Sequence, residues 1–567
     1  MLETTAQRAD FRITGRYDEA ISLCLAFEAA YDDVHCDTIG TTAEGRRIVA
    51  LRIARSASAP YVYFEGGIHA GEIEGKDAGF WFLRDLLDGK VAPGALDHVS
   101  VLFVPVINPD GHERWGKNNR PNQRGPEEMG FRTTSERLNL NRDWVKAESA
   151  EVRAVLALFD KYDPLVFADL HTTDGAKFET DLSVTMSPQT PRPDGLSTAT
   201  TALSAAMMTR LTELGHIPID FYPSFNDDSN PHSGFSVGEA PPRFGVAYMA
   251  ARNRIGLLVE THSWRTYKER VLSTYHAMQA LTEYLAVNGP ALREAMTRAD
   301  ATSAALAGTE VTLTWKTDES QHRDIAFRGY AYERTISDLT GGVWLRYDET
   351  RPEIWTVPLF AHVLPGVTVT APKGGYYVDG GFVARVQAVL DRHGIAYTTA
   401  PTAAPVRIEA FRAEPSTVPA NSVVYRLPLD GAISEEGHTK IPFTGAWKPE
   451  TRTLSRNAIY VPIAQPKARL VMQLLEPTLP DSLAVQGMFN IVLEQKEYAE
   501  DYVLEEQARA MFAADPALAE AFAAYAASAP APTPAQKLMW IYRRTPAWDE
   551  RYGLFPVYRT SDVALPR

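Results

Sequence analysis

The sequence has little cysteine, no cluster of basic residues and no long apolar run. Its 567 residues include only two cysteines, Cys24 and Cys36, which excludes a disulfide-rich scaffold and leaves open whether the two thiols pair or stay separate. The net charge of −14, with no basic run, argues against nucleic acid or an anionic membrane as a partner. No apolar stretch approaches the roughly 20 residues that span a bilayer, so no membrane span is predicted.

The first residues carry no apolar core of the kind that secretory signals have. The expected location is therefore conditional. It is periplasmic or secreted if a signal peptide was removed, and cytoplasmic otherwise.

Composition and length indicate a globular protein with more than one core. Hydrophobic residues make up 45% and charged residues 23%, values typical of packed proteins. At 567 residues the chain exceeds what one core usually organises. Strand-like runs alternate with predicted helices over 147–161, 199–214 and 268–286, which favours an α/β unit. Three regions are predicted: a helical lead-in over 1–40, the α/β unit over 41–307, and a β-rich unit over 308–567 with a helical tail.

A His-x-x-Glu motif follows the first strand-like run of the α/β unit. Residues 61–68 are aromatic and β-branched, and a helical pattern begins soon after His69. His69 is therefore expected in the strand-to-helix turn and Glu72 in the first helical turn, at the sheet edge where α/β folds bind ligands. A capping Glu beside a surface His explains this segment equally well.

Two further strand ends supply the side chains that complete a metal site. The strand-like run 165–170 leads into His171, and the run 254–259 leads into Glu260. Two His and one Glu form one of the ligand sets of catalytic zinc, which keeps one position open for water. A carboxylate that is not a ligand can then act as the general base.

The order of motifs resembles the zinc metallocarboxypeptidase family, the carboxypeptidase A-like (M14) peptidases of the long bacterial two-domain type. The motifs are His-x-x-Glu, then Asn-Pro-Asp-Gly at 108–111, Asn-Arg at 141–142, a strand-end His and a strand-end Glu. The resemblance covers about residues 40–290. It implies a mixed central sheet flanked by helices over 41–307, followed by a β-rich accessory domain.

The resemblance also implies roles for individual residues. His69, Glu72 and His171 match the ligands of one Zn²⁺ per chain, and Glu260 matches the general base and acid. Asn141 and Arg142 match the pair that binds the terminal carboxylate of the substrate, for which a guanidinium is suited by its two parallel hydrogen bonds.

The cation that stabilises the oxyanion is less well specified by the sequence. The family uses an Arg between the Asn-Pro-Asp-Gly turn and the Asn-Arg pair. Arg120 is favoured because its basic, Asn-containing surroundings match best, although the spacing differs from the family's. Arg124 is next, and Arg132 and Arg137 are further candidates, with a solvated loop charge as the alternative for each.

Several other side chains receive weaker assignments. Tyr248 is the candidate for the family's mobile Tyr, with Tyr222 as the second choice and a buried structural Tyr as the alternative for both. Asp169 lies on the same strand face as His171, so it is placed to orient that ligand. His262 stands in the same relation to Glu260.

The specificity pocket of the family is lined by residues shortly before the catalytic Glu. An inward-facing Arg would favour acidic substrate ends, and apolar side chains would favour apolar ones. The sequence does not decide which residues face inward among Arg243, Phe244, Met249, Arg252, Asn253 and Arg254.

The predicted function is a zinc-dependent metallocarboxypeptidase acting on a peptide or small amide with a free C-terminal carboxylate. The alternative is a zinc-dependent deacylase of N-acyl amino acids on the same scaffold. A binding protein that has lost activity is disfavoured because all three ligands and Glu260 are retained. For residues 308–567 the favoured role is a domain packed over the cleft, against a partner-binding module or an oligomerisation surface.

Overall fold

The largest element of the fold is a mixed sheet of eight strands. The structure, a computed structural model, describes residues 2–173, 175–401, 404–413 and 444–562. The strand order is β1-β2-β4-β3-β5-β9-β6-β7. The central strands β4, β3, β5 and β9 are parallel, whereas β2 and β6 run against them. The predicted mixed central sheet is thus confirmed. Its strands are β1 Val34–Thr41, β2 Arg47–Ile53, β3 Tyr61–Gly66, β4 Ser100–Val104, β5 Val166–Thr172, β6 Leu182–Ser187, β7 Pro218–Ile219 and β9 Ile255–Thr261.

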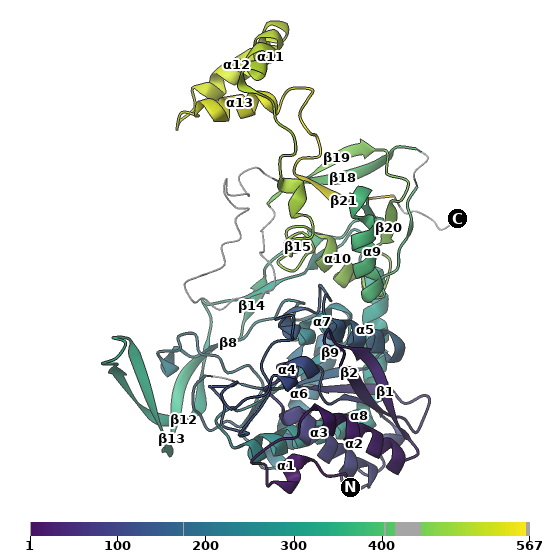
Figure 1. Ribbon diagram of the computed structural model, residues 1–567, viewed down its shortest axis with the longest axis vertical. Helices are drawn as coiled ribbons and strands as arrows, with labels where there is room; N and C mark the ends of the chain where they lie inside the picture. The colour runs from purple at the N-terminus through teal and green to yellow at the C-terminus, as the bar shows by residue number, and fades with distance from the viewer. Residues whose placement is uncertain (1, 174, 402–403, 414–443, 563–567) are drawn as a thin grey trace.

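Helices cover both faces of this sheet (Figure 1). Alternate strand residues point to opposite faces, so Val62 and Phe64 enter one core and Tyr63 enters the other. The helices packed in the first core are α2 Tyr17–Ala30, α3 Glu74–Leu87, α6 Leu196–Glu213 and α8 Tyr267–Ala304. Those packed in the second are α5 Ala150–Tyr162 and α7 Gly245–Ala251.

Helix α8 is longer than the sequence predicts. A helix over 268–286 was expected, but the observed helix has 38 residues and contains Pro290. Buried positions continue at Leu285, Gly289 and Leu292, so tertiary packing holds the helix through the proline. No helix of the described residues combines the length and apolarity needed to cross a bilayer.

Beyond α8 the chain builds a second, antiparallel sheet in the order β17-β20-β16-β21-β18-β19. Its strands are β16 Gly375–Val378, β17 Thr398–Thr399, β18 Val406–Ala413, β19 Gly445–Arg452, β20 Ile459–Pro462 and β21 Leu554–Thr560. Helices α9 Val383–Arg392 and α10 Ala468–Leu475 share the second core with α5. One apolar core therefore joins the two halves of the protein.

Two segments project from this body in Figure 1. One is a long hairpin of β12 Arg323–Ile336 and β13 Val343–Phe360, whose base pairs with β8 Phe235–Ser236. The other consists of helices α11 Asp501–Ala514, α12 Pro516–Ala526 and α13 Pro534–Tyr542. The predicted helical segment is thus present, but it is an insertion between strands and not a tail, because β21 follows it and pairs within the second sheet.

Near the N-terminal end of the chain, Cys24 and Cys36 form a disulfide between α2 and β1.

Candidate metal centre

The predicted ligands meet at the carboxyl edge of the parallel strands. β5 and β9 are neighbours in the sheet, and their register places His171 directly beside Glu260. His69 lies in the turn that leaves β3. Glu72 lies in the same turn and not in the first helical turn as expected, because α3 begins at Glu74.

Glu72 lies between the two imidazoles. Its Oε1 is 3.0 Å from Nδ1 of His69, and its Oε2 is 3.0 Å from Nδ1 of His171. The backbone N–H of Thr172 also donates to Oε2, at 3.1 Å. All three side chains are buried, and their ligand atoms lie within 4.8 Å of one another. The structure therefore brings the predicted ligand set together.

The second ring nitrogen of each imidazole, Nε2, lies near a side-chain oxygen of a further residue. Nε2 of His69 is 3.1 Å from the side-chain oxygen of Asn139, and Nε2 of His171 is 2.8 Å from Oδ2 of Asp169. Metal-binding imidazoles usually have such a partner, which fixes the ring orientation and the tautomer. Both Nδ1 atoms are consequently directed at the same point.

Two arginines neutralise the buried Glu72. Nη2 of Arg120 lies 2.7 Å from its Oε1, and Nη1 of Arg132 lies 3.6 Å from the same oxygen and 3.2 Å from Nδ1 of His69. Burial raises the pKa of Glu72, but the charge of Arg120 and the contacts of both imidazoles hold it well below its usual range. Glu72 is therefore anionic, as a ligand must be.

The two imidazoles have different proton affinities. Burial lowers the pKa of His69 to about 3, and the attraction of Glu72 only partly opposes it. Burial also lowers the pKa of His171, yet Asp169, and after it Glu72 and Glu260, raise it well above the usual value. The anionic surroundings of His171 thus favour a positive charge at this position.

Asn141 and Arg142 lie in a short helical turn beside α7. The side-chain oxygen of Asn141 accepts from the backbone N–H of Gly245 at 3.1 Å, and the guanidinium of Arg142 stacks 4.0 Å above the ring of Phe244. Arg142 also donates to the carbonyl of Asn141 at 2.9 Å. The guanidinium plane is fixed by these contacts, and the side chain remains partly exposed.

Tyr248 does not lie where a mobile lid would be. Its ring is 0% exposed in the second core, and its hydroxyl is 3.0 Å from Nδ1 of His393 on the far half of the chain. Burial raises its pKa to about 12. The expectation of a substrate-binding Tyr248 is wrong on this geometry, and the structural alternative holds. Tyr222, the second choice, is 38% exposed.

The arginines expected near the specificity pocket are held in ion pairs instead. Arg252 pairs with Asp160, Arg254 with Asp163 and Asp300, and Arg243 with Asp481 of the C-terminal half. Among the other sequence candidates, Arg124 pairs with Glu349 of the β12–β13 hairpin. His262 stacks on Phe178 at 4.0 Å, which supports a structural role.

Sequence reasoning missed Asn139, which supports His69, and Glu65, which lies next to Asp169 across β3 and β5. Burial and the charge of Asp169 raise the pKa of Glu65 well above its usual value. The only sequence signal for Glu65 was an acid within an apolar strand. For Asn139 it was its place two residues before Asn141.

The residues present fit a divalent zinc ion. Two imidazole nitrogens and one carboxylate match a catalytic zinc set, and both imidazoles have the outer partners that such ligands need. Glu260 is 6% exposed, lies beside His171 in the register, and is not part of the ligand cluster. It therefore has the position expected of a general base.

Comparison with known proteins agrees with this site. The family model Peptidase_M14, zinc carboxypeptidase, matches residues 21–212, which include the three ligands and the Asn141–Arg142 pair but end before Glu260. No curated protein matches the chain.

Solved structures resemble about half of the chain. A metallo-carboxypeptidase from Burkholderia cenocepacia is 18% identical, with 48% of this chain and 70% of that chain covered and a TM-score of 0.36. A metallo-carboxypeptidase from Pseudomonas aeruginosa, in complex with (2-guanidinoethylmercapto)succinic acid, is 18% identical over 50% and 71%, with a TM-score of 0.37. The carboxypeptidase A from Helicoverpa armigera is 13% identical over 49% and 74%, with a TM-score of 0.37. The family likeness rests on the matched zinc carboxypeptidase model over residues 21–212 and on the predicted site residues that this match contains.

Proposed function

We propose that this protein is a zinc-dependent metallocarboxypeptidase that hydrolyses the C-terminal amide bond of a peptide. The observation that carries the proposal is the convergence of both Nδ1 atoms on Glu72, with Glu260 beside His171. His69, Glu72 and His171 would hold the ion. Bound zinc supplies a Lewis acid that lowers the pKa of water to about 7.

The side chains of this chain then carry out the proton transfers and the binding. Glu260 accepts a proton from the attacking water and delivers it to the leaving amine, so one carboxylate serves as base and then as acid. Arg142 binds the terminal carboxylate of the substrate through two parallel hydrogen bonds. Its stacking on Phe244 fixes the plane of the guanidinium for that contact.

The oxyanion requires a cation beside the ligands. Arg120 and Arg132 both reach the cluster, and Arg120 is engaged with Glu72 at 2.7 Å. The side chain of Arg132 is 26% exposed and that of Arg120 is 9% exposed, so Arg132 is the more accessible of the two. We therefore propose that Arg120 holds Glu72 in place and that the two cations together stabilise the charge that develops.

The test compares Glu260→Gln with the wild-type enzyme on peptides that differ in their C-terminal end. Glu260→Gln should retain zinc and lose about 10²–10⁴-fold in turnover, because only the general base is removed. Loss of zinc from this variant would make Glu260 a ligand and overturn its role. Arg142→Ala should raise KM more for peptides with a free C-terminal carboxylate than for peptides with an amidated C-terminus. Faster turnover of N-acyl amino acids than of any peptide would favour the deacylase instead.

A further inference from the structure

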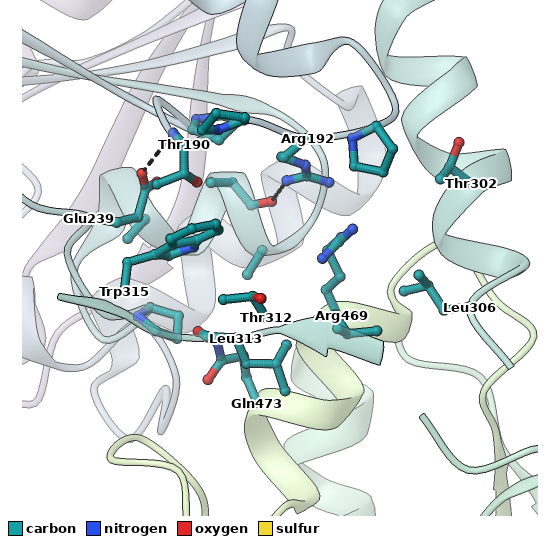
Figure 2. Close-up of a pocket in the computed structure, with 18 of the residues that line it drawn as sticks. Thr190, Arg192, Glu239, Thr302, Leu306, Thr312, Leu313, Trp315, Arg469 and Gln473 are labelled. Atoms are coloured by element: carbon teal, nitrogen blue, oxygen red, sulfur yellow. Dashed lines mark hydrogen bonds between the residues drawn. The ribbon is translucent and has the colours of Figure 1, made fainter. Parts of the chain in front are cut away.

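A pocket lies between the two halves of the protein, away from the metal centre. Its volume is about 470 Å³, within the range of small-molecule sites. It is lined by the loops 188–193 and 239–242, by α7, by the end of α8, by β10 Glu310–Thr312 and β11 Trp315–Thr317, and by α10. Figure 2 shows labelled side chains from the two loops, the end of α8, the strands β10 and β11, and α10 around one space.

The register of the main sheet separates this pocket from the metal centre. On β6, Ser183 lies beside Glu260, whereas Ser187 lies beside Gly256. Ser187 bonds to Glu239 of the pocket wall. Four residues of strand therefore separate the two places, roughly 13 Å at about 3.3 Å per residue.

Arg469 provides a positive charge that no carboxylate contacts in the part of the chain that the structure describes. It projects from α10 into the pocket, as Figure 2 shows, and no hydrogen bond or ion pair joins it to any residue that the structure describes. Its Nε is buried without a hydrogen-bond partner. Burial, and then the charge of Arg192, lower the pKa of Arg469 to about 10, and the charge of Asp194 only partly opposes this. A half-buried guanidinium whose Nε has no partner is costly, which is a reason to expect an anion there.

The other charged groups of the pocket are already satisfied or distant. Arg192 pairs with Asp194 at 2.8 Å and donates to the carbonyl of Ala250 at 2.9 Å. The carboxylate of Glu239 is held by Ser187 and by backbone N–H groups at 3.3 Å. The acid that raises the pKa of Arg469 is Asp194, and its carboxylate is already paired with Arg192.

Most of the remaining lining is apolar and includes an aromatic ring. Trp315, Leu313, Leu306 and Ala247 contribute to it, together with several prolines. Gln473 is occupied by the carbonyl of Leu313 at 2.6 Å. The pocket therefore offers one two-pronged cation and an apolar wall.

We infer that this pocket binds a small organic carboxylate with an apolar or aromatic body. Arg469 takes the carboxylate through parallel hydrogen bonds, and the body of the ligand packs against Trp315 and Leu313. Because the ligand contacts both α7 and α10, it joins the two halves of the chain. The inference does not depend on the proposed peptidase activity.

Isothermal titration calorimetry of the full-length protein with phenylacetate tests this inference, with 2-phenylethanol as the uncharged analogue of similar size. Wild-type protein should bind phenylacetate, and Arg469→Gln should weaken this binding roughly 10- to 100-fold, the loss expected for a charge-assisted hydrogen bond. Arg469→Lys, which keeps the charge but not the fork, should bind with intermediate affinity. The exposed Arg385→Gln serves as the matched control and should leave binding unchanged.

Carboxylates can also bind at the metal centre, so Arg142→Gln is titrated in parallel and should retain phenylacetate binding. Three results would overturn the inference. They are equal affinity of wild type and both Arg469 variants, equal affinity for 2-phenylethanol, and no binding to wild type up to about 10 mM. Loss of binding in Arg142→Gln alone would place the probe at the metal centre and would also overturn it.

Discussion

The substitution Tyr248→Phe distinguishes two roles for this side chain, a mobile lid over the substrate and a buried core residue. His393 is fully buried, and burial lowers its pKa to about 4, so the ring is neutral at pH 7. Its Nε2 is 2.8 Å from the carbonyl of Val145, and Nε2 must therefore carry the proton. Nδ1 is then an acceptor, and the Tyr248 hydroxyl donates to it at 3.0 Å.

The size of the effect follows from this arrangement. Tyr248→Phe removes the donor and leaves Nδ1 of His393 buried without one, which costs about 1–3 kcal/mol. We expect urea unfolding to show this loss of stability, and turnover of a peptide substrate to stay within about twofold at a temperature where both proteins are folded. Tyr502→Phe is the control, because that ring is 69% exposed and should change stability by less than about 0.5 kcal/mol. A tenfold fall in kcat/KM for Tyr248→Phe with unchanged stability would refute the core assignment.

Three further predictions concern the same two halves and the metal centre. Burial lowers the pKa of His393 to about 4, so the unfolded chain binds a proton more readily than the folded protein. The free energy of unfolding should therefore fall by about 3 kcal/mol as the pH drops from about 6.5 toward 4. Urea unfolding across this pH range measures the fall, and its absence would contradict the prediction. Asp169→Asn should weaken zinc binding about 10- to 100-fold in a chelator competition, and unchanged affinity would remove Asp169 from its orienting role. Arg243→Ala should cost about 3 kcal/mol of unfolding free energy, because it leaves Asp481 buried without the guanidinium 2.8 Å away, and a loss below about 0.5 kcal/mol would contradict this.

The placement of the ligand set could be predicted because it depends on local pattern and one general rule. His171 and Glu260 each follow a strand-like run, and carboxyl ends of parallel strands share one edge of a sheet. The observed register pairs these two residues directly. Asp169 could be placed on the face of His171 from the two-residue period of a strand alone.

The errors arose where a side chain depends on a partner far away in sequence. Tyr248 contacts His393, 145 residues later, and no local pattern indicates such a contact. Arg254 shows the same problem, since its partners Asp163 and Asp300 lie 91 and 46 residues away. Glu65 could be recognised only once β3 was known to pair with β5.

Zinc content is the most direct test of the central claim, that His69, Glu72 and His171 hold one catalytic ion. Purified protein is dialysed against zinc-buffered solution, and metal is measured per chain by mass spectrometry for wild type, Glu72→Gln and Glu260→Gln. We expect about one zinc per chain in wild type and in Glu260→Gln, and a trace in Glu72→Gln. Full occupancy in Glu72→Gln, or no zinc in wild type, would contradict the account.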